Sequence, residues 1–212
     1  MSTTTYTPTG IHAVPHASGM AVAKARTAAE GASRSGIWVA IFAITMSFAA
    51  FTSALFVREG SAGDWTHLVL PRILYANTLA LLLSSITVHR ASKAIQSRTY
   101  LEPQTVSTVM AWLVATFALG LLFIAGQYEA WRQLAAQGLF LATNPNSSFF
   151  YVFTGMHILH LLGGIAALVY LIGRLAGSYT TFRRAAFANT TIYWHFMGVL
   201  WVYLLLVLRT KI

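Results

Sequence analysis

Five long apolar stretches, separated by polar segments, dominate the chain. Four of them run for 19 to 25 residues without Asp, Glu, Lys or Arg. The second reaches a similar length when the flank that holds Pro71 and Arg72 is counted. A helix that rises about 1.5 Å per residue needs about 20 residues to cross about 30 Å of hydrocarbon. The pattern therefore predicts five transmembrane helices, at about residues 37–57, 68–88, 106–126, 149–173 and 190–208.

Each crossing must be helical, because lipid offers backbone N–H and C=O groups no hydrogen-bond partner. We therefore expect an all-α, polytopic membrane bundle that occupies residues 35–212. Residues 1–34 contain no sustained apolar run and are rich in Ser, Thr, Ala and Gly. This composition predicts a flexible N-terminal tail.

The basic residues indicate how the bundle is oriented. Nine Lys and Arg residues lie in the tail and in the segments 89–105 and 174–189, against five on the opposite side. Cytoplasmic segments carry the excess of Lys and Arg in membrane proteins. The count predicts a cytoplasmic N-terminus and an external C-terminus, in a multi-pass protein of a bacterial cytoplasmic membrane.

Composition supports the membrane interpretation and excludes several other classes. Hydrophobic residues make up 57% of the chain and charged residues 9%, against about 25% charged residues in ordinary soluble domains. The net charge of +9 follows the topology, so no nucleic-acid partner is expected. The chain has no Cys, which excludes disulfides and thiolate metal sites.

A stripe of small residues follows one face of the first apolar stretch. At about 100° per residue its members fall within an arc of about 80°. Small side chains let two membrane helices approach closely, so we expect this stripe to pack inside the bundle and Ala50→Leu to weaken it. The stripe consists of Gly36, Ala40, Ala43, Ser47, Ala50 and Ala54.

Four ionisable residues in or beside the apolar stretches are candidates for chemistry: His157, His160, His195 and Glu129. Ionisable groups are costly in a bilayer and often functional. The histidines either bind a metal or haem, as in a b-type cytochrome, or make hydrogen bonds between helices or to lipid headgroups. No carboxylate lies at a helix centre to balance a metal dication, so the second interpretation is favoured. We expect no catalysis by this chain alone, and a small transporter is the weakest alternative.

Several motifs, taken in order, resemble the cytochrome c oxidase subunit III family in its five-helix bacterial form. An aromatic run precedes Thr154-Gly155 and the pair His157 and His160, which Gly163-Gly164 follow. The other matching motifs are Asn77-Thr78 with Ser84-Ser85, Gln127-x-Glu129-x-Trp131, and Tyr193-Trp194-His195-Phe196 followed by Trp201. The resemblance covers about residues 35–209.

The resemblance implies a non-catalytic core subunit of an aerobic respiratory haem–copper oxidase. Such a subunit would pack against subunit I, bind phospholipid and support proton uptake during electron transfer to oxygen. The resemblance also allows for membership in a larger respiratory supercomplex. Haems and copper would belong to partner subunits, with no cofactor in this chain. The candidate lipid or inter-helix contacts are Arg58, Arg90, His157, His160 and His195, and the candidate subunit contacts are Glu129 and Trp131.

Two positions depart from the family pattern. Ile44 replaces the buried glutamate of the family's Ser-Glu-x-Met segment, and Gly198 replaces the usual acidic residue of the last helix. A proton-collecting role for these two positions is not expected here, whereas structural support and lipid binding remain. A subunit III-like protein of a quinol oxidase or nitric oxide reductase stays open as an alternative.

Overall fold

The computed structural model describes residues 16–61, 69–96, 102–177 and 184–212, with side chains in the first helix described at Gly31 and from Arg34 onward. All regular structure in these ranges is helical, which confirms the all-α expectation. The helices are α1 (His16–Ser61), α2 (Ile73–Gln96), α3 (Pro103–Ala136), α4 (Pro145–Gly177) and α5 (Arg184–Lys211).

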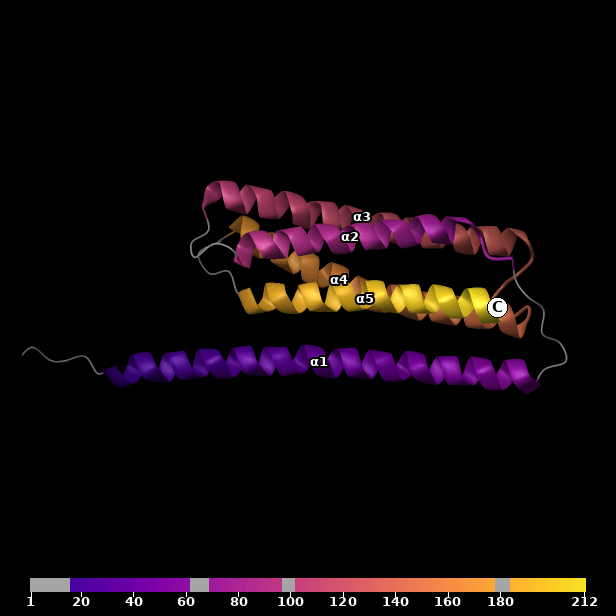
Figure 1. Ribbon diagram of the computed structural model, residues 1–212, viewed down its shortest axis with the longest axis horizontal. Helices are drawn as coiled ribbons and strands as arrows, with labels where there is room; N and C mark the ends of the chain where they lie inside the picture. The colour runs from indigo at the N-terminus through magenta and orange to yellow at the C-terminus, as the bar shows by residue number, and fades with distance from the viewer. Residues whose placement is uncertain (1–15, 62–68, 97–101, 178–183) are drawn as a thin grey trace, which may run out of the picture.

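The five helices lie nearly parallel in one elongated bundle (Figure 1). α2 packs along α3 over most of its length, and α4 packs against α3 and α5. α5 packs against α1, α2 and α4. α1 lies on the outside of the bundle and contacts mainly α5, and its N-terminal part projects beyond the other helices.

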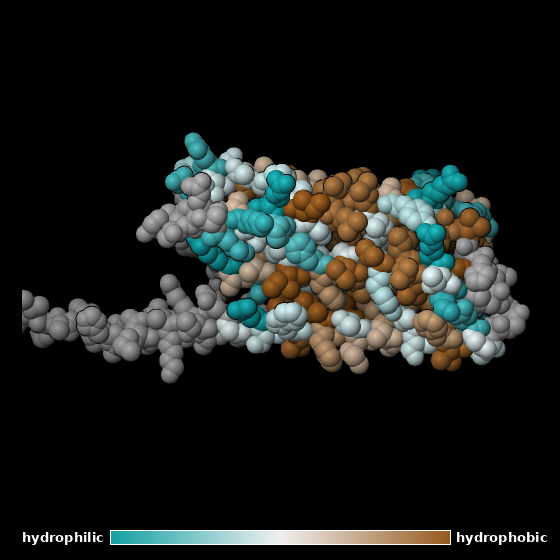
Figure 2. Space-filling model, in the orientation of Figure 1, coloured by the Kyte–Doolittle hydropathy of each residue, from teal (hydrophilic) through white to brown (hydrophobic). Residues whose placement is uncertain are grey.

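Four segments are long and apolar enough to cross a membrane, namely Arg34–Ser61 of α1 and the whole of α3, α4 and α5. The space-filling view shows a hydrophobic middle zone between hydrophilic ends, as expected for a bilayer-embedded bundle (Figure 2). α2 is less apolar, because polar residues such as Asn77, Ser84 and Ser92 interrupt it. These three side chains are buried and therefore face the other helices.

The first helix begins much earlier than the apolar pattern indicates. α1 starts at His16, so the structure differs from the flexible tail expected for residues 1–34; residues 1–15 lie outside the described ranges. The segment is rich in Ala, which has the strongest helix propensity, and also holds Lys24, Arg26 and Glu30. Helix propensity, without any apolar periodicity, accounts for the extension.

The small-residue stripe of α1 does not pack inside the chain, so that expectation is wrong. Ala50 and Ala54 of the stripe are exposed. The buried face of α1 instead carries large side chains, among them Phe48, which stacks on Phe153 of α4 with ring centroids 6.4 Å apart. Large aromatic rings bury more apolar surface than a stripe of Ala, and they decide which face of α1 turns inward.

Candidate functional site

Trp194 of α5 contacts three other helices. It is fully buried, and its Nε1 donates a hydrogen bond to Oγ of Ser84 on α2 over 2.9 Å. Its ring lies against Gly120 of α3 and Gly164 of α4, where an added Cβ would come within 3.0 Å and 3.2 Å of ring atoms. The two glycines therefore leave the room that a buried indole requires.

The neighbours of Trp194 in the sequence extend this junction in two other directions. The Tyr193 hydroxyl donates to the carbonyl oxygen of His160 on α4 over 2.8 Å. The His195 ring lies beside the ring of His89 on α2, with centroids 5.9 Å apart. One turn of α5 thus holds α4 on one side and α2 on the other.

A second junction lies two turns further along α5. Trp201 is buried, and its Nε1 donates to Oγ1 of Thr78 on α2 over 2.9 Å. Its ring meets Phe123 edge to face at 4.7 Å and lies 5.1 Å from the ring of His157. The Asn-Thr motif of α2 also contributes Asn77, whose Oδ1 would overlap a Cβ added at Gly126 of α3.

The three histidines singled out from the sequence occupy three different environments. His157 is fully buried between aromatic rings, and neither ring nitrogen has a hydrogen-bond partner among the described residues. His160 Nδ1 lies 2.7 Å from the carbonyl oxygen of Met156 in the preceding turn. His195 is half-buried beside His89. Within the described ranges, no three or more His, Cys, Asp or Glu side chains gather at a metal site.

The two candidate subunit contacts, near the C-terminal end of α3, have different surroundings. Trp131 points inward, and its Nε1 donates to Oγ1 of Thr154 on α4 over 3.0 Å. Glu129 stays at the surface, where its carboxylate lies 3.3 Å from Arg132. Tyr151 donates to the carbonyl oxygen of Leu139 over 2.9 Å, which fixes the turn between α3 and α4.

The two arginines lie in different places. Arg58 is half-buried at the end of α1. Arg90 is exposed on α2, with its guanidinium 5.8 Å from the centre of the Trp112 ring on α3. An Arg over a Trp at an apolar boundary is typical of a membrane interface. The five candidate lipid or inter-helix residues therefore do not form one cluster.

Two polar contacts between α1 and α5 were missed from the sequence. Lys211 of α5 pairs with Glu59 of α1 over 3.1 Å. Tyr203 donates to Oγ1 of Thr52 over 2.9 Å. The hydroxyl groups of Tyr and Thr are common in any apolar helix, so only the packing shows which of them meet. Glu59 was visible as the sole acid at the end of the first apolar stretch.

The positions that depart from the family motifs lie on the inner faces of α1 and α5. Ile44 is a buried member of the apolar core. Gly198 lies against α2, where an added Cβ would be 3.1 Å from Ser85 Oγ.

Comparison with known proteins decides the family. A sequence model described as cytochrome c oxidase subunit III matches residues 28–210. The chain belongs to the cytochrome c oxidase subunit III family. Relatives named probable cytochrome c oxidase subunit 3 in Mycobacterium tuberculosis (32% identity; 76% of this chain and 77% of the relative) and cytochrome c oxidase subunit 3 in Thermostichus vulcanus (30%; 80% and 82%) are similar to the chain. A third occurs in Nocardia farcinica (31%; 74% and 77%).

Membership in the subunit III family explains what the junctions do. The chain is a membrane subunit of a haem–copper oxidase complex with other subunits. Subunit III is the non-catalytic, metal-free member of that complex, and the cofactors belong to its partners. The family motifs Tyr193-Trp194-His195, Asn77-Thr78 and the Thr154 segment are the residues that hold the helices together.

Proposed function

We propose that this chain is the core subunit III that stabilises the catalytic subunit I of a bacterial cytochrome c oxidase. The observation that carries the proposal is the set of buried bonds between aromatic and hydroxyl groups on different helices, supplied largely by the family motifs. Such bonds specify which helices pair and in what register. They suit a protein whose task is to present a fixed shape to a neighbour.

In this proposal α2 is the fifth transmembrane helix. Its buried side chains include the polar ones, whereas its exposed side chains from Tyr75 to Ile86 are apolar: Tyr75, Ala76, Leu79, Leu82, Leu83 and Ile86. At about 1.5 Å per residue its 24 residues span about 36 Å, longer than the hydrocarbon core. The polar residues that lower the apolar content of α2 face protein, so lipid meets an apolar surface.

The charge distribution supports an N-terminus on the cytoplasmic side. The ends of α2 and α4 that carry Arg90, Lys93 and Arg174 would then lie at the cytoplasmic surface. Arg90 on Trp112 marks that interface on α2 and α3. Arg58 would mark the external interface on α1 and, with Arg90, offer a cation to lipid phosphate.

This chain would support proton uptake only indirectly. Ile44 places an aliphatic side chain in the core at the position of the family's buried glutamate. We propose that the chain sustains turnover by holding subunit I and lipid in place. Glu129, half-exposed at the external end of α3, is the candidate contact with a partner, and Trp131 bonds the same end of α3 to α4.

Purification of the tagged full chain from its native membrane in mild detergent tests the proposal. We expect peptides of subunit I to copurify and the sample to show haem absorbance. The control for non-specific copurification is the tagged variant Phe150→Asp, which would disrupt the buried core. Recovery of the intact chain without any haem–copper subunit would contradict the proposal.

A further inference from the structure

Three buried polar side chains in the interior of the bundle have atoms without a hydrogen-bond partner among the described residues. These atoms are Nδ2 of Asn77, both amide atoms of Gln127 and both ring nitrogens of His157. Gln127 and His157 are 0% exposed, and Asn77 is 4% exposed. Leaving a buried polar group without a partner is costly, and folded proteins contain few such groups. The three side chains, here called the polar cluster, therefore indicate a bound ligand.

Contacts on either side of Gln127 place it beside His157. One helical turn before Gln127, the ring of Phe123 lies 5.6 Å from the ring of His157. One turn after it, Trp131 donates a hydrogen bond to Thr154, which lies three residues before His157 on α4. Residues three or four apart lie on one face of a helix. The buried Gln127 side chain therefore enters the space between α3 and α4 at the level of His157.

Asn77 brings α2 to the same level. Its amide lies against Gly126 of α3, where an added Cβ would overlap the amide oxygen. The next residue of α2, Thr78, accepts a hydrogen bond from Trp201. The ring of Trp201 in turn lies 5.1 Å from the ring of His157. The members of the polar cluster thus come from α2, α3 and α4 and lie in one layer of the bundle.

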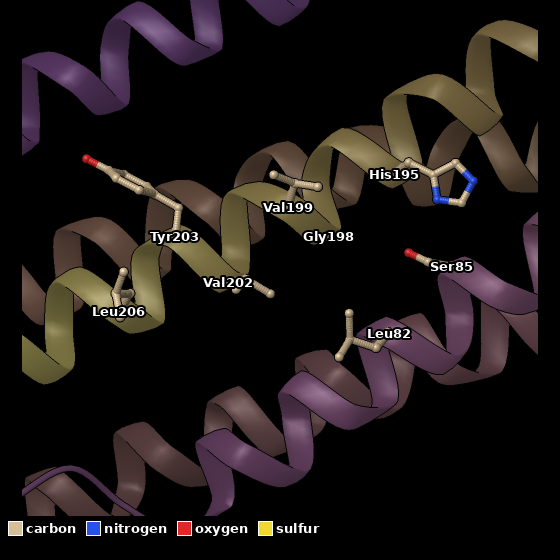
Figure 3. A pocket seen from close by; sticks show the side chains of 8 residues that line it. All are labelled: Leu82, Ser85, His195, Gly198, Val199, Val202, Tyr203 and Leu206. Atoms are coloured by element: carbon tan, nitrogen blue, oxygen red, sulfur yellow. The ribbon is translucent and has the colours of Figure 1, made fainter.

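The polar cluster is closed to the surroundings of the protein. Ser85 and His195 show the contrast, since they line the hollow between α5 and α2 and are half-buried, so that molecules outside can contact them (Figure 3). The side chains that pack around the polar cluster include Phe123 and Trp201, which are 0% exposed. A partner for the unpaired atoms must therefore be held inside the bundle.

The mixture of donors and acceptors in the polar cluster selects water as that partner. Amide nitrogens donate, the amide oxygen of Gln127 accepts, and a neutral imidazole has one nitrogen of each kind. A cation would meet the donors and an anion would meet the acceptors. Within the described residues, no three His, Cys, Asp or Glu side chains gather at a metal site. Water both donates and accepts, and buried water typically makes about three hydrogen bonds to groups that otherwise lack partners.

We propose that the polar cluster of Asn77, Gln127 and His157 binds internal water, which bridges α2, α3 and α4 beside Trp201. Bonds through water are nearly as favourable as direct ones. The water therefore links the three helices at a level where their polar side chains make no direct bond to one another. The site lies wholly inside this chain, so it does not depend on the proposed function.

Electron cryo-microscopy of the chain, purified from its native membrane with its partner subunits, tests the site at a resolution that shows ordered water. In the wild type we expect water density within about 3.2 Å of a His157 ring nitrogen and of the Gln127 amide. A direct bond between these two side chains without water density would overturn the inference. Density for a metal ion or an organic molecule in the polar cluster would also overturn it.

His157→Phe removes two of the unpaired atoms and should abolish the water density. His160→Phe is the matched control, because it makes the same change about one turn further along α4, where the ring already has the carbonyl oxygen of Met156 as a partner. It should retain the water. Gln127→Leu, which replaces the amide with an apolar side chain of similar size, keeps the test decisive if His157→Phe does not fold. Water density that persists in His157→Phe or Gln127→Leu, or that disappears in His160→Phe, would contradict the site.

Thermal unfolding of the same variants in detergent measures whether Gln127 and His157 share the water. Each single variant leaves the other polar side chain without its partner, so both should lower the unfolding midpoint. The double variant removes both polar groups together. Its midpoint should therefore fall by less than the sum of the two single shifts. Additive shifts would show that no shared water connects the two side chains.

Discussion

Trp194 and Ser84 are 110 positions apart in the sequence, yet the indole Nε1 of Trp194 donates to the Ser84 hydroxyl over 2.9 Å in the interior of the bundle. The Ser84 hydroxyl in turn donates a hydrogen bond to the carbonyl oxygen of Leu81 in the preceding turn, 2.6 Å away. The hydroxyl is thus both acceptor and donor. A bond of this kind in an apolar interior fixes the register of α5 against α2.

Trp194→Phe should therefore destabilise the chain by about 2–4 kcal/mol, because it removes a buried hydrogen bond and leaves space against Gly120 and Gly164. Thermal unfolding of the purified chain in detergent measures the effect. Trp38→Phe is the control, since Trp38 is 58% exposed and its replacement should stay within about 0.5 kcal/mol. Equal midpoints for the two variants would show that Trp194 does not hold the junction.

Gly126→Ala should destabilise the contact between α2 and α3 by about 1–3 kcal/mol, because its Cβ would overlap Oδ1 of Asn77. The double variant Asn77→Ala with Gly126→Ala should recover part of that loss, since the overlap is then gone. Gly173→Ala, in open surroundings, should be neutral or stabilising by up to about 1 kcal/mol. Additive losses in the double variant would contradict a direct contact.

The pair of Glu59 and Lys211 ties the C-terminal end of α5 to α1. Both side chains are about a quarter to a third exposed, so Lys211→Ala should cost no more than about 1 kcal/mol and less at high salt. A double-mutant cycle with Glu59→Gln, followed by thermal unfolding at two salt concentrations, isolates the pair. A coupling energy that does not change with salt would argue against an ionic link.

The exposed stripe of α1 leads to a different expectation from the one that the sequence suggests. Ala50→Leu should leave the unfolding midpoint of the isolated chain within the range of a surface substitution, about 0.5 kcal/mol, because Ala50 is exposed. Phe48→Ala should cost about 3–5 kcal/mol, because Phe48 is 1% exposed and packs on Phe153 and Phe51. Reversed magnitudes would mean that α1 docks through the stripe after all.

The sequence predicted the helices well, because apolar length is a direct consequence of bilayer thickness. It did not predict the contacts of α1. Periodicity showed that Ala50 and Ala54 share a face, but which face turns inward depended on Phe48 and its stacking on Phe153 of α4. The extension of α1 to His16 depended on helix propensity. Apolar length did not reveal it, because this segment is not apolar.

The candidate site was predicted only in part. The motifs around Trp194, Asn77 and Thr154 were identified, but the residues that they contact, Ser84, Gly126 and Trp131, lie on other helices. A sequence pattern shows on which face of its helix a residue lies. It does not show which residues of a neighbouring helix lie at the same height. His157 shows the same limit, since its burial between Phe123 and Trp201 depends on three helices at once.

The most direct test of the central claim separates this chain from its purified oxidase complex and compares the absorbance spectra of the two fractions. The account predicts that the Soret band, the copper and all oxygen reduction stay with the other subunits, while the separated chain remains a folded, colourless helical protein in detergent. A Soret band that stays with the separated chain, or oxygen consumption by it, would contradict the account.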